Sequence, residues 1–399
     1  MKKVLILTFL TILYSANLFA QKEKYPSKEE DEYYKNLDRN YVPFKPLDKE
    51  FILDFKPEHY EMHESGLNYE PYSPDKYLTP YADSVYSKMF SRDFDIQKIV
   101  IETIGKIDKT QILKYEKKDS IEAFIYESYE YDKFSWSGES PGIWVACSEN
   151  SGKDWSYYYT GITQRQPVFV KYYSQIPLIK ENGKLEIEAC LLRQLSPFSH
   201  PGPGPSYECV KDGIYLVFDI DVIAKDSDED GLTDIVEDKL YTDKFNKDTD
   251  GDGIPDNLDT NPRVHYPRTE KSKIYEAIID EKIDWNDKSG TGKLLFSGNA
   301  TYFVADSTET ILIVTDNEDL MGIQPEKYRV IFMTSEEYQN NTKTYKTGLN
   351  VMVFTPLFKV NNKENTYKMT YNYKTWGSKY LIKKTEKGWT IEMILTWIS

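Results

Sequence analysis

Cysteine is scarce in this chain, and its scarcity limits how far covalent cross-links can support the fold. The 399 residues include only three cysteines, which allow at most one intramolecular disulfide. Cys190 and Cys209 are the preferred pair, because they flank the loop RQLSPFSHPGPGPSYE and a bridge between them would close it. Three reduced, buried thiols, with Cys147 as the third, are the alternative, and both arrangements stay open.

Positive charge and the common catalytic motifs are missing as well. The formal net charge is −15 and no basic patch occurs, which argues against nucleic acid as a partner because an acidic protein repels phosphate backbones. The chain contains no GxSxG, Walker or dinucleotide-binding motif. These absences favour a protein that is not an enzyme.

Long apolar runs are confined to the amino terminus. Lys2 and Lys3 precede an apolar run from Val4 to Tyr14, and small and polar residues follow as far as Ala20. This pattern predicts a cleavable secretory signal over residues 1–20. The run is too short for a transmembrane helix, and no later segment qualifies. We therefore expect an exported protein that is secreted, periplasmic or at the cell surface, with no transmembrane segment in the mature chain.

Hydrophobic periodicity predicts a mainly β or α+β protein with several parts. Residues 21–94 are rich in Tyr and Pro and predict an extended arm. Residues 95–224 alternate with a period near two, as in GIWVACS and KLEIEACLLRQL, and predict an antiparallel, β-sandwich-like domain. Residues 270–399 predict an α+β domain with an antiparallel sheet, beginning with an amphipathic helix within SKIYEAIIDEKI.

An acidic segment joins the two β-rich regions. Residues 226–259 contain 13 Asp and Glu against three Lys, and like charges this close repel one another unless a counter-ion is present. The spacing DxDxDGxxDxxE is that of a twelve-residue calcium loop. The first loop supplies side chains and one backbone carbonyl from Asp226, Asp228, Asp230, Leu232 (carbonyl), Asp234 and Glu237.

A second loop repeats this spacing of acidic residues 22 residues later. Its predicted ligands are Asp248, Asp250, Asp252, Ile254 (carbonyl), Asp256 and Asp259. So many hard carboxylate oxygens suit Ca²⁺ better than Mg²⁺, and neither loop contains the His or Cys that would indicate zinc. An EF-hand is not expected, because residues 214–222 alternate as a strand where the entering helix should be.

The tandem "DSDEDGLTD…YTDKFNKDTDGDGIPD" resembles the bacterial form of the thrombospondin type 3 repeat over about residues 226–262. The resemblance implies several calcium ions along a segment with almost no apolar core. It also makes Asp243 and Asn246 weaker candidates as bridging ligands. Vertebrate members carry cysteines after the second loop, where this chain has Thr260, Asn261 and Pro262, so disulfide support is not expected there.

Together these features predict an exported calcium-binding protein whose repeat is a calcium-rigidified connector between two β-rich domains. A role in binding or adhesion follows as the first hypothesis, with a glycan or another protein as the ligand, because exposed Tyr and Trp are common on such binding faces and the chain has 33 Tyr. The alternative is a secreted hydrolase acting on glycans or peptides, with the repeat as a spacer.

Overall fold

The computed structural model describes twelve stretches of the chain. They are residues 25–36, 46–65, 112–127, 142–162, 166–171, 174–196, 206–285, 301–302, 309–342, 351–373, 376–386 and 388–398. The predicted signal sequence and the segments 37–45 and 66–111 lie outside them. No helix among the described residues is both long and apolar enough to cross a membrane.

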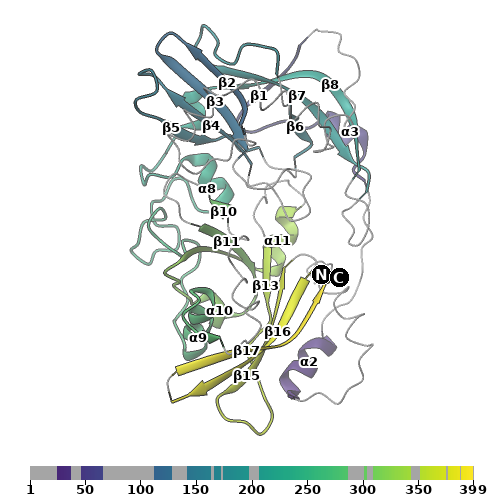
Figure 1. Cartoon of the computed structure of the whole chain (residues 1–399), viewed down its shortest axis with the longest axis vertical. Helices are drawn as coiled ribbons and strands as arrows, with labels where there is room; N and C mark the ends of the chain where they lie inside the picture. The colour runs from purple at the N-terminus through teal and green to yellow at the C-terminus, as the bar shows by residue number, and fades with distance from the viewer. Residues whose placement is uncertain are drawn as a thin grey trace.

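The protein is mainly β, as the sequence predicted, and its described strands form three sheets (Figure 1). Two are four-stranded and antiparallel. The first has the order β2(Ile112–Lys118), β3(Ile121–Glu127), β4(Ile143–Ser148), β5(Ser156–Tyr159). The second has the order β1(Glu61–Glu64), β8(Tyr207–Phe218), β7(Leu185–Gln194), β6(Val168–Val170).

The third sheet contains nine strands and is mixed. Its main path is β10(Thr301–Tyr302), β11(Glu309–Val314), β13(Val351–Phe354), β15(Thr366–Tyr373), β16(Trp376–Thr385), β17(Gly388–Ile398), β9(Asp284–Trp285). Beside it, β12(Tyr328–Met333) pairs with β11 and β14(Phe358–Lys359) pairs with β15. Most pairs are antiparallel, as expected, but β11 is parallel to β12 and β13, and β17 is parallel to β9.

Helices accompany the strands of the third sheet. Helix α9(Glu270–Ile279) confirms the predicted amphipathic helix; it begins at a capping box formed by Thr269 and Ser272 and buries Ile274 and Ile278. The strand crossovers carry α10(Glu318–Met321) and α11(Ser335–Thr342). Parallel neighbours need such crossover connections, which explains why helices appear between β11, β12 and β13.

Strands β11 and β12 are buried on both faces, and this places them between two apolar cores. On β11, Ile311 and Ile313 pack with α9, whereas Leu312 and Val314 point the other way. Those two side chains join one large cluster with the two antiparallel sheets. Successive residues of a strand face opposite sides, so one short apolar strand serves both cores. The two β-rich regions therefore share a continuous apolar cluster.

Parts of the predicted arm are helical rather than extended. Residues 25–36 include α2(Lys28–Asn36), and residues 46–65 include α3(Lys49–Leu53) and the edge strand β1. Prolines were expected to exclude helices here, but α2 contains none and has three acidic residues in its first turn, where the helix dipole favours them. The remaining residues of the arm lie outside the described ranges.

One predicted strand end is also a helix. The alternation of residues 214–222 predicted a strand up to the first acidic loop, but β8 ends at Phe218 and α7(Ile220–Ile223) follows. The side chain of Asp219 accepts a hydrogen bond from the amide of Asp221 and caps this single turn. The local cap therefore outweighs the alternating pattern, although a long EF-hand entering helix is indeed absent from this stretch.

The two cysteines of the predicted pair lie next to each other but form no disulfide. Cys190 lies on β7 and Cys209 on β8, their side chains are in hydrogen-bond contact, and all three cysteines are free thiols. Cys147 is on β4, in the other antiparallel sheet.

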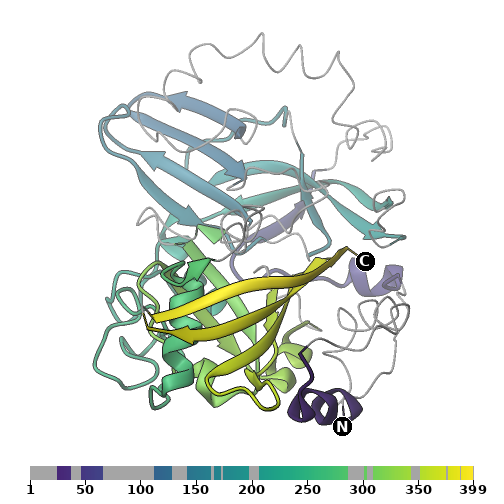
Figure 2. The same cartoon turned by 60° about the horizontal axis from the view of Figure 1, so that its bottom comes forward.

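The amino-terminal helix α2 packs against strands of the third sheet that come much later in the chain (Figures 1 and 2). Glu30, which is 3% exposed, forms ion pairs with Lys368 on β15 and with Lys379 on β16. Lys368 is completely buried. A buried charge is tolerated only when it is paired, so Glu30 fixes the position of the helix.

We expect Glu30→Gln to lower the free energy of unfolding by about 3 kcal/mol, because it leaves the buried ammonium of Lys368 without a counter-charge. Urea denaturation measures this. Glu32→Gln, on the exposed side of the same helix, is the matched control and should change little. Equal effects of the two substitutions would contradict the role of the ion pair, and adding Lys368→Met to Glu30→Gln should restore part of the loss.

Candidate metal centre

The two acidic loops fold with the same internal hydrogen bonds. In both loops, the carboxylate at position one accepts hydrogen bonds from the backbone amides of positions four and six. The carboxylate at position three accepts from the amide of position five, and the carboxylate at position five accepts from the amide of position seven. The carboxylate at position nine accepts from the amide and the hydroxyl of position two, and all donor–acceptor distances are 2.7 to 3.1 Å. The first loop runs from Asp226 and the second from Asp248. The repeat seen in the sequence is thus a repeat in structure.

The glycine at position six is required by the backbone of each loop. Gly231 has φ +102° and Gly253 has φ +96°, a region that side chains with a Cβ rarely adopt. Position four is also left-handed, with φ 61° at Glu229 and 76° at Gly251. The two turns direct the amides of the loop at its own first carboxylate, so the carboxylates line the inside of each loop.

Carboxylates converge in both loops, but not in the same way. Oxygens of Asp226, Asp228 and Asp230 lie within 4.8 Å of one another in the first loop. In the second loop, the corresponding group of converging atoms comes from Asp250, Asp252 and the imidazole of His265, and Asp248 is not part of it. Either group could hold a metal ion.

Several buried carboxylate oxygens have no hydrogen-bond donor. At position three these are Oδ2 of Asp228 and Oδ2 of Asp250, and at position twelve they are Oε2 of Glu237 and Oδ2 of Asp259. Glu237 is 0% exposed and Asp259 is 2% exposed. A buried carboxylate oxygen without a donor is costly, and a cation in each loop would supply the missing partner.

Burial and mutual repulsion raise the pKa values of Glu237, Asp256 and Asp259. The pKa of Glu237 rises to about 8, first because of its burial and then because of Asp228, Asp230 and Asp256. Burial also raises the pKa of Asp256 and of Asp259 to about 6, with nearby carboxylates adding to the effect. The centre therefore lacks positive charge where it is most crowded.

The two loops pack against each other. The amide of Asn257 in the second loop donates to Oδ2 of Asp230 in the first, at 3.1 Å, and Nζ of Lys247 donates to the carbonyl of Glu229 at 2.9 Å. Asp256 is close enough to raise the pKa of Glu237. The loops therefore form one acidic centre rather than two independent units along an extended chain.

Helix α8(Asp234–Leu240) connects the first loop to the amino-terminal sheets. It carries Glu237 on one side and buries Ile235, Val236 and Leu240 in the large shared cluster. Nζ of Lys239 donates to the hydroxyl of Tyr159 at 2.9 Å. The helix that carries Glu237 is thus also part of the core.

The end of the segment is tied to the third sheet. The side-chain amide of Asn261 donates to the carbonyls of Met321 and Ile323, at 2.9 and 3.1 Å. The guanidinium of Arg263 donates to the carbonyls of Tyr241 and Phe332. Because Tyr241 ends α8 and Phe332 is on β12, Arg263 links the acidic segment to both of its neighbours.

The remaining predicted ligands of the two loops are two backbone carbonyls and two carboxylates. The carbonyls of Leu232 and Ile254 accept no hydrogen bond from the described residues, so both remain free for an ion. Both oxygens of Asp234 and of Asp256 already accept hydrogen bonds within their loops. These two residues support the loop shape as well as adding charge.

Asp243 and Asn246 lie in the exposed turn between the loops. Asp243 accepts from the amide of Phe245, and Asn246 donates to the carbonyl of Asp248. Neither belongs to a converging group of ligand atoms among the described residues. Both side chains therefore act here on the backbone of the turn.

Two residues of the centre were not predicted. Oδ1 of Asn257 is buried without a donor, and His265 reaches the second loop from six residues beyond its last ligand. Asn257 lies between two counted loop positions, so its place could have been suspected from the sequence. No sequence signal indicated His265, because it lies outside the loop motif.

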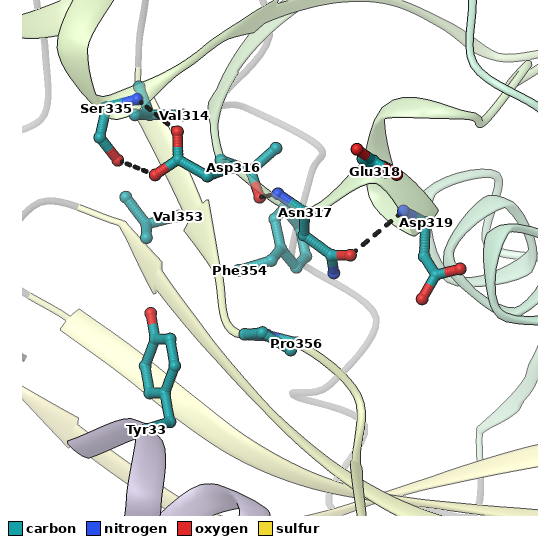
Figure 3. A pocket seen from close by; sticks show the side chains of 11 residues that line it. Tyr33, Val314, Asp316, Asn317, Glu318, Asp319, Ser335, Val353, Phe354 and Pro356 are labelled. Carbon is teal, nitrogen blue, oxygen red and sulfur yellow. Dashed lines mark hydrogen bonds between the residues drawn. The ribbon is translucent and has the colours of Figure 1, made fainter. Parts of the chain in front are cut away.

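Apart from this centre, a pocket of about 470 Å³ opens in the third sheet, beyond the carboxyl ends of the parallel strands β11 and β13 (Figure 3). Asp316, Glu318 and Asp319 line it, with no Lys, Arg or His among its described lining residues. Tyr33 of α2 forms another wall and points toward Val353. Open sheets bind ligands at such ends.

The chain matches no protein family, no curated protein and no solved structure in our comparisons. What can be said of the centre therefore comes from its own geometry. That geometry is an acidic, partly buried cluster whose oxygens lack donors, held between two β-rich regions.

In metal-free buffer, we expect stability to fall as pH rises from about 5 to 8. Carboxyl groups with a raised folded-state pKa favour folding while they are protonated, and they lose that contribution as pH rises through the folded-state pKa, which is about 8 for Glu237 and about 6 for Asp256 and Asp259. Thermal unfolding across this range measures it. Glu237→Gln should remove the part of the decline above pH 7; a midpoint that rises over the same range would contradict the crowding argument.

Proposed function

We propose that residues 226–262 bind calcium ions and that the ions hold the two β-rich regions in a fixed arrangement. The observation that carries this proposal is the set of buried, donor-free carboxylate oxygens at positions three and twelve of both loops. Calcium accepts six to eight oxygens in flexible geometry, whereas magnesium demands a strict octahedron and keeps several waters. The loop carboxylates and free carbonyls supply oxygens of the kind that calcium prefers.

The position of the segment supports a structural role rather than a calcium-triggered switch. Helix α8 carries a proposed ligand, Glu237, and inserts Leu240 into the shared cluster. Opening the loop would therefore disturb apolar packing on both sides. Ion binding and the arrangement of the two regions form one equilibrium under this proposal.

An exported location fits the same proposal. The first 20 residues have the features of a secretory signal, and calcium modules outside cells work with dissociation constants of about 0.1 to 1 mM. We propose that the protein is secreted, periplasmic or at the cell surface. Calcium at such concentrations would keep the centre filled.

The proposed calcium role is tested by chelation. At a calcium concentration of about 100 times the dissociation constant, binding adds about 2.7 kcal/mol to stability. Removing calcium should therefore speed proteolysis within residues 226–262 by up to about 100-fold, while circular dichroism shows the flanking sheets still folded. Calorimetry should detect calcium uptake directly, and its complete absence would overturn the proposal.

Substitutions within one loop sharpen this test. Glu237→Gln removes a proposed ligand, and we expect at least about a tenfold loss of calcium affinity, because the bidentate carboxylate at position twelve closes such a loop. Glu229→Gln removes the same charge from an exposed residue of the same loop. If both substitutions weaken calcium binding equally, general electrostatics rather than coordination is responsible.

A second candidate function, ligand binding, is favoured by the pocket of the third sheet. We propose that it takes a small organic cation. Its carboxylates and the rings of Tyr33 and Phe354 are the groups that attract an ammonium, and its volume is in the usual range for ligand sites. Asn372, on the strand position opposite Val353, is 1% exposed, and its amide has no hydrogen-bond partner among the described residues.

Choline and its neutral carbon isostere dimethylbutanol test this role. We expect choline to bind and the isostere to bind at least about fivefold more weakly, since a cation held by aromatic and acidic groups gains about 1 kcal/mol or more. Titration by NMR measures both. Glu318→Gln should weaken choline binding, whereas Glu336→Gln, an exposed residue of α11 outside the pocket lining, should not; equal binding of choline and isostere would refute a cation site.

A further inference from the structure

The second acidic loop differs from the first in donor chemistry. The atoms that converge in the first loop are all carboxylate oxygens, whereas Asp250 and Asp252 in the second converge with an imidazole nitrogen. Nδ1 of His265 lies 3.8 Å from Oδ2 of Asp252. Two loops that are nearly identical in sequence pattern thus present different sets of ligand atoms.

A buried carboxylate without a donor adjoins this mixed group. Asp259 is 2% exposed, and its Oδ2 has no hydrogen-bond partner. It lies within electrostatic range of Asp252 and Asp250, and Oδ2 of Asp250 is itself buried without a donor. The carboxylates that face His265 are therefore short of hydrogen-bond donors.

The backbone between the second loop and His265 is anchored to its neighbours. The side chain of Asn261 donates hydrogen bonds to the carbonyls of Met321 and Ile323, and the side chain of Arg263 donates to the carbonyls of Tyr241 and Phe332. Val264 packs against the core of the third sheet. The imidazole is consequently presented to the loop by a fixed stretch of chain.

We infer that the second loop, besides taking calcium, offers a mixed oxygen and nitrogen site for a divalent transition-metal ion, with Asp250, Asp252 and His265 as ligands and the buried carboxylate of Asp259 nearby. Imidazole nitrogen is a good ligand for zinc, nickel and copper, whereas calcium selects oxygen. Two carboxylates and one imidazole are three protein ligands, and they leave the fourth position of a tetrahedral zinc site open. The first loop, which has oxygen donors only, is expected to take calcium and not a transition-metal ion.

This inference rests on the proposed metal-binding function of the acidic segment, but it concerns the second loop alone. Cadmium is a suitable probe, because it binds both oxygen and nitrogen ligands and its NMR resonance moves downfield when nitrogen coordinates. We expect two resonances from the full-length protein, one typical of oxygen ligands and one shifted downfield. His265→Asp should move the second resonance into the oxygen-only region and leave the first in place.

Zinc affinity gives an independent readout by calorimetry in the presence of saturating calcium. Even outer-shell partners of metal ligands are worth about 10- to 100-fold in affinity, so His265→Ala should weaken zinc binding at least about tenfold. His63→Ala is the control, because His63 is another exposed histidine and lies on β1. Calcium uptake by the first loop should be the same in all three proteins.

The outcomes separate this inference from the calcium proposal. Two oxygen-type cadmium resonances, together with zinc binding that His265→Ala does not change, would overturn the mixed site and leave calcium binding intact. If neither calcium nor cadmium binds, both proposals fail. A downfield resonance that His63→Ala removes would also refute the assignment to His265.

Discussion

The structure depends on carboxylates that are buried in its centre without enough positive charge around them. Glu237 and Asp259 are almost inaccessible to water, and each keeps an oxygen without a donor. A folded chain tolerates such groups only when they are protonated or paired with a cation. Glu237 belongs to helix α8, which also packs in the shared core. The unpaired negative charge of the acidic segment therefore affects the stability of the whole fold.

The parallel strands β11 and β12 explain how the acidic segment becomes central. Because they are apolar on both faces, they pack with α9 on one side and with α8 and the amino-terminal sheets on the other. The end of the segment adds main-chain contacts to the same strands, including a 2.7 Å hydrogen bond from the amide of Val330 to the carbonyl of Thr260. A segment with little apolar surface of its own is thereby held by its neighbours.

Most individual strands could be predicted because alternation is a local property. The pattern located β4, β7 and the amphipathic helix α9 correctly. It failed at Ile220–Ile223, where the Asp219 cap turns an alternating stretch into a helix. It also could not distinguish parallel from antiparallel pairing, because a short apolar strand such as β11 looks the same in either arrangement.

The sequence by itself determined the order of oxygen ligands in each loop, because DxDxDG sets a local turn whose glycine allows the left-handed backbone. The matching hydrogen bonds of the two loops follow from that spacing. Only the tertiary structure decided that the loops pack on each other, that α8 enters a shared core and that His265 reaches the second loop. These contacts join residues that are far apart in the sequence. Packing and anchors such as Arg263 set the distances between them, and no local sequence pattern encodes those distances.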